Sequence, residues 1–190
     1  MSSIGVRIDR MIKKVFYSWK DVQGACLDIA RQMYNDDWRP DYIVGITRGG
    51  LVPANLLSQF LNIKLHTLDV SLRDSNHPPE SNLWMAEDAF GYVPNSTPDT
   101  TRVDPAYRKK ILVVDDINDQ GNTIAWIKKD WQGSCLPDND VWNHIWGNNV
   151  RFATLTNNLA SKETVDYSVW EVNKAEEDCW LVYPWEDFWK

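Results

Sequence analysis

Apolar residues recur along the chain with two different spacings, and these spacings predict an alternation of helices and strands. Residues 18–34 carry apolar side chains at helical intervals, namely Val22, Ala25, Cys26, Ile29, Ala30 and Met33. Ser18 is suited to cap this helix, and Asp21 three residues later is typical of a capping box. Residues 42–46 form a short continuous apolar run instead, as expected for a strand that is buried on both faces.

The alternation continues through the rest of the chain. Pro53 suits the first turn of a second helix, and the apolar residues after it give that helix a buried side. Further strands are predicted at residues 63–70, 111–115, 150–156 and 165–172, a helix at 122–131, and a connection with some helical turns at 132–148. The pattern predicts an α/β fold, a doubly wound and mainly parallel sheet flanked by helices, formed as a single domain by residues 1–190.

One long segment, residues 73–109, departs from this regularity. It holds five prolines among many small polar residues and shows no clear period. A stretch of this kind inside a compact domain is either a plain surface excursion or a functional loop. Because it directly precedes the strongest motif of the chain, we expect a mobile lid, with Arg102 as its ligand-facing residue.

Composition narrows the class of protein. The chain has 190 residues, a formal net charge of −7 and no run of Lys or Arg, which argues against a nucleic-acid partner. Its three cysteines are far apart, and its N-terminus has no long apolar run. We therefore expect a reduced cytoplasmic protein with no membrane partner. If a protein this acidic binds a highly charged anion, a divalent cation must offset the repulsion, and Mg²⁺ is the natural candidate.

The strongest motif follows the strand at 111–115. Asp115 and Asp116 are adjacent carboxylates at a strand end, where a doubly wound sheet binds its ligands. The loop after them ends in Gly121, Asn122 and Thr123, which open a helix whose free N–H groups favour a phosphate. An acidic strand end that merely caps the next helix would not explain two adjacent aspartates. A ligand with a phosphate beside a diol, such as ribose 5-phosphate, satisfies both halves.

This stretch resembles the phosphoribosyl pyrophosphate signature of the type I phosphoribosyltransferases. Gln120 is a departure, because the family usually has Thr or Ser there. The resemblance implies that Asp115 and Asp116 act in catalysis by holding the ribose or the waters of a bound Mg²⁺, and that Asp119 handles the proton of the base. It also implies that residues 120–123, Gln120, Gly121, Asn122 and Thr123, hold the 5′-phosphate.

A second motif, residues 44–54, also follows a buried strand. Arg48 offers a forked donor to an oxygen pair, and Gly49 and Gly50 expose backbone N–H groups. With Thr47 they are similar to the pyrophosphate loop of the bacterial xanthine–guanine phosphoribosyltransferases. In such loops a cis peptide that does not involve proline is expected, and we place it between Thr47 and Arg48.

The C-terminal segment is similar to the purine-covering tail of the same enzymes. The resemblance implies a small hood over residues 157–190, in which Trp180 stacks on the base and Leu181 offers backbone contacts to its edge. The alternative is that the tryptophans of this tail lie in the core or in a dimer interface. We favour stacking for Trp180 and the core or an interface for Trp185.

One departure concerns the base. The purine enzymes place a Lys just after the strand equivalent to 150–156, where this chain has Asn157 and Asn158. Asn158 can still hydrogen-bond to the base, and Lys162 is another substitute. We predict transfer of the phosphoribosyl group to a 6-oxopurine by a homodimer or homotetramer. Transfer to another nucleobase, and a non-catalytic regulator that binds phosphoribosyl pyrophosphate or a nucleotide, remain alternatives.

Overall fold

The protein is described by a computed structural model that covers residues 13–70, 72, 81–93, 103–177 and 179–186. Its elements are β1 (Lys13–Phe16), α1 (Trp19–Asn35), β2 (Tyr42–Thr47), α2 (Leu51–Leu61), β3 (Lys64–Asp69), α3 (Leu83–Phe90), the 3₁₀ turn η1 (Pro105–Tyr107), β4 (Ile111–Asn118), α4 (Asn122–Ser134), α5 (Trp142–Ile145), β5 (Val150–Asn158), β6 (Tyr167–Val172) and β7 (Cys179–Val182).

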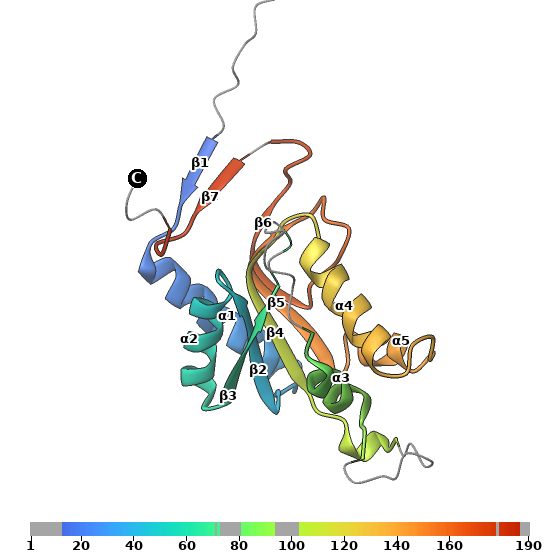
Figure 1. The fold of residues 1–190 in the computed structure, drawn as a ribbon. Helices are drawn as coiled ribbons and strands as arrows, with labels where there is room; N and C mark the ends of the chain where they lie inside the picture. Colours follow the sequence, from blue (N-terminus) through green and yellow to red (C-terminus); the bar gives the residue numbers. More distant parts are fainter. Residues whose placement is uncertain (1–12, 71, 73–80, 94–102, 178, 187–190) are drawn as a thin grey trace, which may run out of the picture.

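Five strands form the central sheet in the order β3-β2-β4-β5-β6, and every neighbouring pair is parallel. Helices α1 and α2 cover one face, and α3, α4 and α5 cover the other (Figure 1). The predicted doubly wound parallel sheet is therefore confirmed. The carboxyl ends of β2, β4, β5 and β6 lie along the same edge of this sheet, which is where ligands bind in such folds.

Strand β4 shows why its sequence is a continuous apolar run. All four residues from Ile111 to Val114 are fully buried. Ile111 and Val113 belong to the core under α3, α4 and α5, whereas Leu112 and Val114 belong to the core under α1 and α2. Because successive side chains of a strand point to opposite faces, a central strand covered on both sides needs an apolar residue at every position.

Helix α1 forms as the sequence predicts. The Ser18 hydroxyl accepts a hydrogen bond from the backbone N–H of Asp21, and the Asp21 carboxylate accepts one from the backbone N–H of Ser18. This capping box fixes the start of the helix. Its buried residues are Val22, Ala25, Cys26, Ile29 and Met33, which are five of the six predicted apolar positions.

The expectation of an irregular segment at residues 73–109 is wrong for part of it. Residues 83–90 form α3, and Met85, Ala86, Ala89 and Phe90 of this helix are buried. The Phe90 ring packs against Trp142 at 5.2 Å between ring centroids. A two-turn helix is too short to show a period in the sequence, and tertiary packing stabilises it. Arg102 lies outside the described residues.

Trp131 of α4 packs with tryptophans of the segment that follows this helix. Trp131 and Trp142 are fully buried, and Trp146 stacks on Trp142 at 5.3 Å between ring centroids. The Trp142 indole N–H donates to the carbonyl of Cys135 at 3.0 Å, which closes the connection onto α4. This segment therefore extends the core under α3 and α4.

The C-terminal segment that is expected to form the hood includes strand β7, which the sequence did not predict. Strand β1 pairs in parallel with β7, and the two form a separate ribbon beside the start of α1 (Figure 1). The ribbon has a buried face with Cys179 and Leu181 and an exposed face with Phe16 and Trp180. Among the described residues, no helix has the length and apolar character needed to span a membrane.

Candidate active site

Strand β4 runs three residues beyond its predicted end, through Asn118. Asp115 and Asp116 therefore lie inside the strand rather than after it. Backbone pairing continues to β5 at Ile117 and Asn118, which join Thr156 and Asn157. The pairing holds the two acids on a rigid backbone, directly before the loop 119–121.

The two acids are half-buried neighbours. Burial, together with the negative charge of Asp116, raises the pKa of Asp115 well above the usual range of a carboxyl. Burial also raises the pKa of Asp116. A cation at this position would lower the cost of holding two adjacent charges.

The acidic pair fits Mg²⁺ in its donor chemistry. Carboxylate oxygens are hard ligands, and Mg²⁺ in phosphate-handling enzymes is held by one or two carboxylates, with substrate oxygens and water as its other ligands. Within the described residues, no group of three or more His, Cys, Asp or Glu side chains is arranged for a metal. A Mg²⁺ site formed by two protein carboxylates and by substrate oxygens is compatible with this donor chemistry. It also needs no group of three such protein side chains.

The loop after β2 lies directly against the acidic pair. The peptide bond between Thr47 and Arg48 is cis, as the resemblance of residues 44–54 implies. A side chain at Gly49 would overlap the Asp116 carboxylate, and one at Gly50 would overlap the carbonyl oxygen of Val114. The two glycines therefore let the loop approach the end of β4, and this approach brings the two sequence motifs into one site.

Thr47, at the end of β2, contacts another strand, whereas Arg48, in the loop after it, faces solvent. The Thr47 hydroxyl donates to the Asp69 carboxylate at 2.9 Å, which ties the ends of β2 and β3 together. Arg48 is exposed and so can reach a ligand. Helix α2 begins at Leu51, immediately after the loop, so its N-terminal N–H groups also face this edge of the sheet.

The loop after β4 ends at Gly121, which adopts a left-handed backbone with φ of 81° and precedes α4. A Cβ at this glycine would lie 2.8 Å from the backbone nitrogen of Glu163. No side chain caps the start of α4, so its first N–H groups are available to an anion. The Gln120 side-chain oxygen accepts a hydrogen bond from Asn122 at 3.1 Å, which keeps Gln120 at the rim of this loop.

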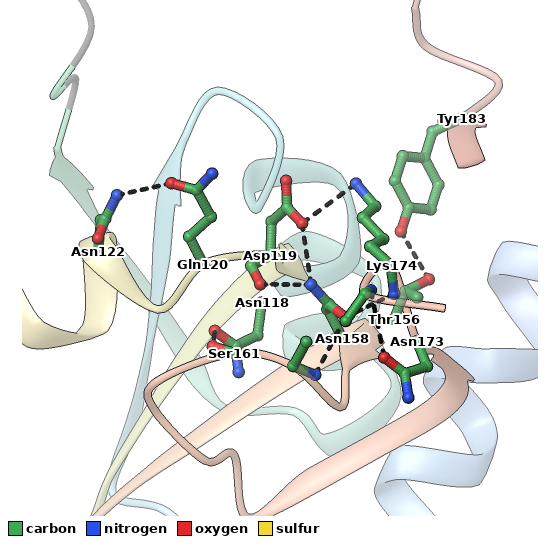
Figure 2. Close-up of polar contacts among 12 residues, drawn as sticks. Asn118, Asp119, Gln120, Asn122, Thr156, Asn158, Ser161, Asn173, Lys174 and Tyr183 are labelled. Carbon is green, nitrogen blue, oxygen red and sulfur yellow. Dashed lines mark hydrogen bonds and ion pairs between the residues drawn. The ribbon is translucent and has the colours of Figure 1, made fainter. Parts of the chain in front are cut away.

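Asp119 lies in a group of polar side chains from three segments of the chain (Figure 2). Lys174, which follows β6, pairs with the Asp119 carboxylate at 3.1 Å. The Asn158 amide nitrogen donates to the backbone oxygen of Asp119 at 2.9 Å and to its carboxylate at 3.3 Å. The carboxylate expected to handle the proton therefore has a cation and an amide fixed beside it.

Asn158 holds this group together. It is only 6 % exposed, and its amide oxygen accepts from the backbone nitrogens of Ala160 at 3.2 Å and Lys174 at 3.1 Å. Since both ends of its amide bind protein atoms, the structure gives Asn158 a positioning role. Its direct contact with a base stays a prediction.

Lys174 is a site residue that the sequence did not indicate. No motif marks it, and its only signal is that it follows a predicted strand by two residues. Lys162, which the sequence offers as a substitute beside Asn158, is exposed. The backbone nitrogen of Lys162 donates to the Gln120 carbonyl at 3.4 Å. The structure thus pairs the later lysine, and not the earlier one, with Asp119.

The tail after β7 is fastened to the acidic strand. The Tyr183 hydroxyl lies 3.0 Å from the carbonyl oxygen of Asp116 and 2.8 Å from the Thr156 hydroxyl. The Trp185 ring stacks on Tyr183 at 5.0 Å between ring centroids and borders the core, as favoured from the sequence. Trp180 is 54 % exposed, and Leu181 buries its side chain against the core. Stacking of Trp180 on a base and backbone contacts from Leu181 stay predictions.

Comparison with known proteins places this geometry in a family. Residues 16–186 match the family model of the phosphoribosyl transferase domain. The chain is 25 % identical over 197 residues to the hypoxanthine-guanine phosphoribosyltransferase of Schizosaccharomyces pombe, covering 91 % of this chain and 89 % of that protein. It is 26 % identical over 183 residues to the xanthine-guanine phosphoribosyltransferase of Chromohalobacter salexigens, covering 94 % and 88 %.

A solved structure shares the fold. The purine phosphoribosyltransferase from Pyrococcus horikoshii superposes with a TM-score of 0.62 at 24 % sequence identity, covering 93 % of this chain and 96 % of that one. At this identity the likeness concerns the fold alone.

Proposed function

The chain belongs to the phosphoribosyl transferase domain family, and on that premise we propose that it transfers the 5-phosphoribosyl group of phosphoribosyl pyrophosphate to a 6-oxopurine. The enzyme class predicted from the sequence, a phosphoribosyltransferase related to the xanthine–guanine enzymes, is confirmed by the family match and the relatives. The products would be a nucleoside monophosphate and pyrophosphate. The identity of the base and the need for Mg²⁺ belong to the proposal.

The observation that carries the proposal is the position of Asp119. It follows the acidic pair by three residues and precedes the phosphate loop, and it also pairs with Lys174 from the opposite side of the site. A donor bound along β4 would therefore present its C1 carbon beside a carboxylate that has a cation next to it. That arrangement suits a reaction at the junction of a ribose and a base.

The donor would be held by the two loops. The N–H groups at the start of α4 would bind the 5′-phosphate, and Arg48 and the glycines after it would bind pyrophosphate. Asp115 and Asp116 would hold the ribose hydroxyls or the waters of Mg²⁺, which when bound supplies positive charge to the leaving pyrophosphate. The approach of Gly49 to Asp116 supports this sharing of one ligand between the two motifs.

The reaction forms a bond between a base nitrogen and C1 as the bond from C1 to the pyrophosphate oxygen breaks. Positive charge develops on the ribose ring during this exchange, and the aspartates stabilise it. The base must lose a proton from its imidazole ring. The Asp119 carboxylate is suited to accept that proton, because it is fixed by Asn158 and remains partly exposed.

The remaining parts of the proposal concern the setting of the enzyme. The three cysteines are free and buried, which supports a cytoplasmic location. Phe16 and Trp180 are 69 % and 54 % exposed on one face of the hood ribbon, which supports a homodimer or homotetramer, since aromatic residues are enriched at interfaces. Light scattering at several protein concentrations would measure that assembly.

A single assay tests the function. The protein is incubated with phosphoribosyl pyrophosphate, Mg²⁺ and one base at a time from a panel of hypoxanthine, guanine, xanthine, adenine, uracil and orotate, and pyrophosphate release is measured. We expect release with one or more of the 6-oxopurines and none when Mg²⁺ is chelated. Release with a pyrimidine alone would reject the purine assignment. Tight donor binding without turnover on any base would identify a non-catalytic regulator instead.

A further inference from the structure

We infer that Lys174 determines the specificity of the enzyme by donating a hydrogen bond to the exocyclic oxygen of a 6-oxopurine, an inference that rests on the proposed function. Its ammonium group lies 3.1 Å from the Asp119 carboxylate. Because an ammonium group has three N–H donors and Asp119 uses one of them, donors remain for a ligand beside the same carboxylate.

The position of Lys174 is fixed by the backbone around it. Its own backbone nitrogen donates to the Asn158 side chain at 3.1 Å. Asn173 closes a turn, because its backbone oxygen accepts from Glu176 and Glu177 and its side chain accepts from Ala175. A lysine on a tight turn, with its side chain 22 % exposed, loses less freedom on binding a ligand than one on an open surface.

Two other lysines near the site, Lys128 and Lys162, contact other residues. Lys128 pairs with Glu163 at 2.6 Å. Lys162 is exposed, and the contact the structure gives it comes from its backbone to Gln120. Among the ion pairs of the described residues, Asp119 takes part in the pair with Lys174. Lys174 is therefore the cation that meets a base whose proton Asp119 accepts.

The pair matches one edge of a 6-oxopurine. On that edge the N7 nitrogen carries a proton in one tautomer, and the oxygen on C6 is adjacent to it. A carboxylate accepts from the first group and an ammonium donates to the second, so Asp119 and Lys174 satisfy both at once. A 6-aminopurine presents an amino donor in place of the oxygen, and two donors facing each other leave both unpaired. The pair thus favours oxo over amino bases.

The test compares hypoxanthine with unsubstituted purine, which lacks the oxygen on C6, in the wild type and in the variants Lys174→Gln and Lys162→Gln. For each protein kcat/KM is measured for both bases at saturating phosphoribosyl pyrophosphate, and donor affinity is measured separately by calorimetry. We expect Lys174→Gln to lower the ratio of the two kcat/KM values roughly tenfold to a hundredfold, the range of a charge-assisted hydrogen bond. Donor affinity and the Lys162→Gln variant should match the wild type.

The outcomes separate this inference from the proposed function. If Lys174→Gln lowers kcat/KM equally for both bases, the lysine only positions Asp119 and the inference is overturned while the function stands. If Lys162→Gln changes the ratio instead, the assignment belongs to Lys162. If the wild type turns over none of hypoxanthine, guanine and xanthine, the proposed function fails and the inference fails with it. Lys174→Arg, which keeps a cationic donor, should retain part of the preference for hypoxanthine.

Discussion

The site has two halves that are built in different ways. The donor half consists of the loops after β2 and β4, and each of its residues lies in one of two short contiguous motifs, 44–54 and 111–123. The half that would bind the base is assembled from Asn158 at the end of β5, Lys174 after β6 and Tyr183 after β7. Asp119 is the residue at which the two halves meet.

The difference follows from what each half has to bind. Phosphates are bound by backbone N–H groups at helix starts, so their site needs a local sequence with glycine and a helix cap. A base is bound by side chains that converge on its edge, and these can come from any segments that tertiary structure brings together. We therefore expect a change of acceptor to depend on substitutions in the second half, and we expect the close packing of Gly49 and Gly50 against β4 to make the donor half intolerant of substitution there.

Asp119→Asn tests the point where the halves meet and should have the largest effect. The amide can still accept the hydrogen bond from Asn158, but it cannot accept a proton from the base. We expect kcat to fall roughly a hundredfold, as for loss of a general base, while the melting temperature and the donor affinity stay close to those of the wild type. Steady-state kinetics of pyrophosphate release would measure this. Unchanged turnover would remove Asp119 from the reaction.

Gly49→Ala tests whether the donor half is as intolerant as its packing suggests. The new Cβ would overlap the Asp116 carboxylate, which must then move. We expect a stability loss of about 1–3 kcal/mol from overpacking, together with a higher KM for phosphoribosyl pyrophosphate. Gly133→Ala is the matched control, because a Cβ added at this position of α4 would have no atom within 4 Å, and it should be neutral or slightly stabilising. Equal behaviour of the two variants would contradict the account of Gly49.

The same division explains what the sequence could predict. The parallel sheet, the helix capped by Ser18 and the loops after β2 and β4 follow from local patterns, and the cis peptide follows from the resemblance of residues 44–54 to a known loop. All of these appear in the structure. Helix α3 was not predicted because two turns show no period and depend on contacts with α4 and α5. Lys174 was not predicted because nothing in its own segment indicates Asp119, which lies 55 positions earlier and is reached only through the parallel pairing of β4, β5 and β6.

The two hood tryptophans allow a paired test of the base half. Trp185 stacks on Tyr183, so Trp185→Ala should lower the free energy of unfolding by about 2 kcal/mol through lost aromatic contacts. Trp180 is exposed, so Trp180→Ala should change stability by less than about 0.5 kcal/mol. If Trp180 stacks on the base, its loss should raise the KM for the base roughly three- to tenfold. An unchanged KM with a loss of self-association would place Trp180 in an interface instead.

Tyr183→Phe should have the smallest effect and tests how firmly the two halves are joined. The Tyr183 hydroxyl links the hood to the acidic strand and to β5, through the carbonyl of Asp116 and the hydroxyl of Thr156. Burial raises the pKa of the Tyr183 phenol, so it remains a protonated donor throughout the neutral range. Its removal should cost about 1 kcal/mol in urea unfolding, because one buried hydrogen-bonding group loses its partner. If the hood positions the acidic pair through this link, the KM values for donor and base should rise together by a small factor. If only the KM for the base rises, the hood acts on the acceptor alone and the donor half is independent of it.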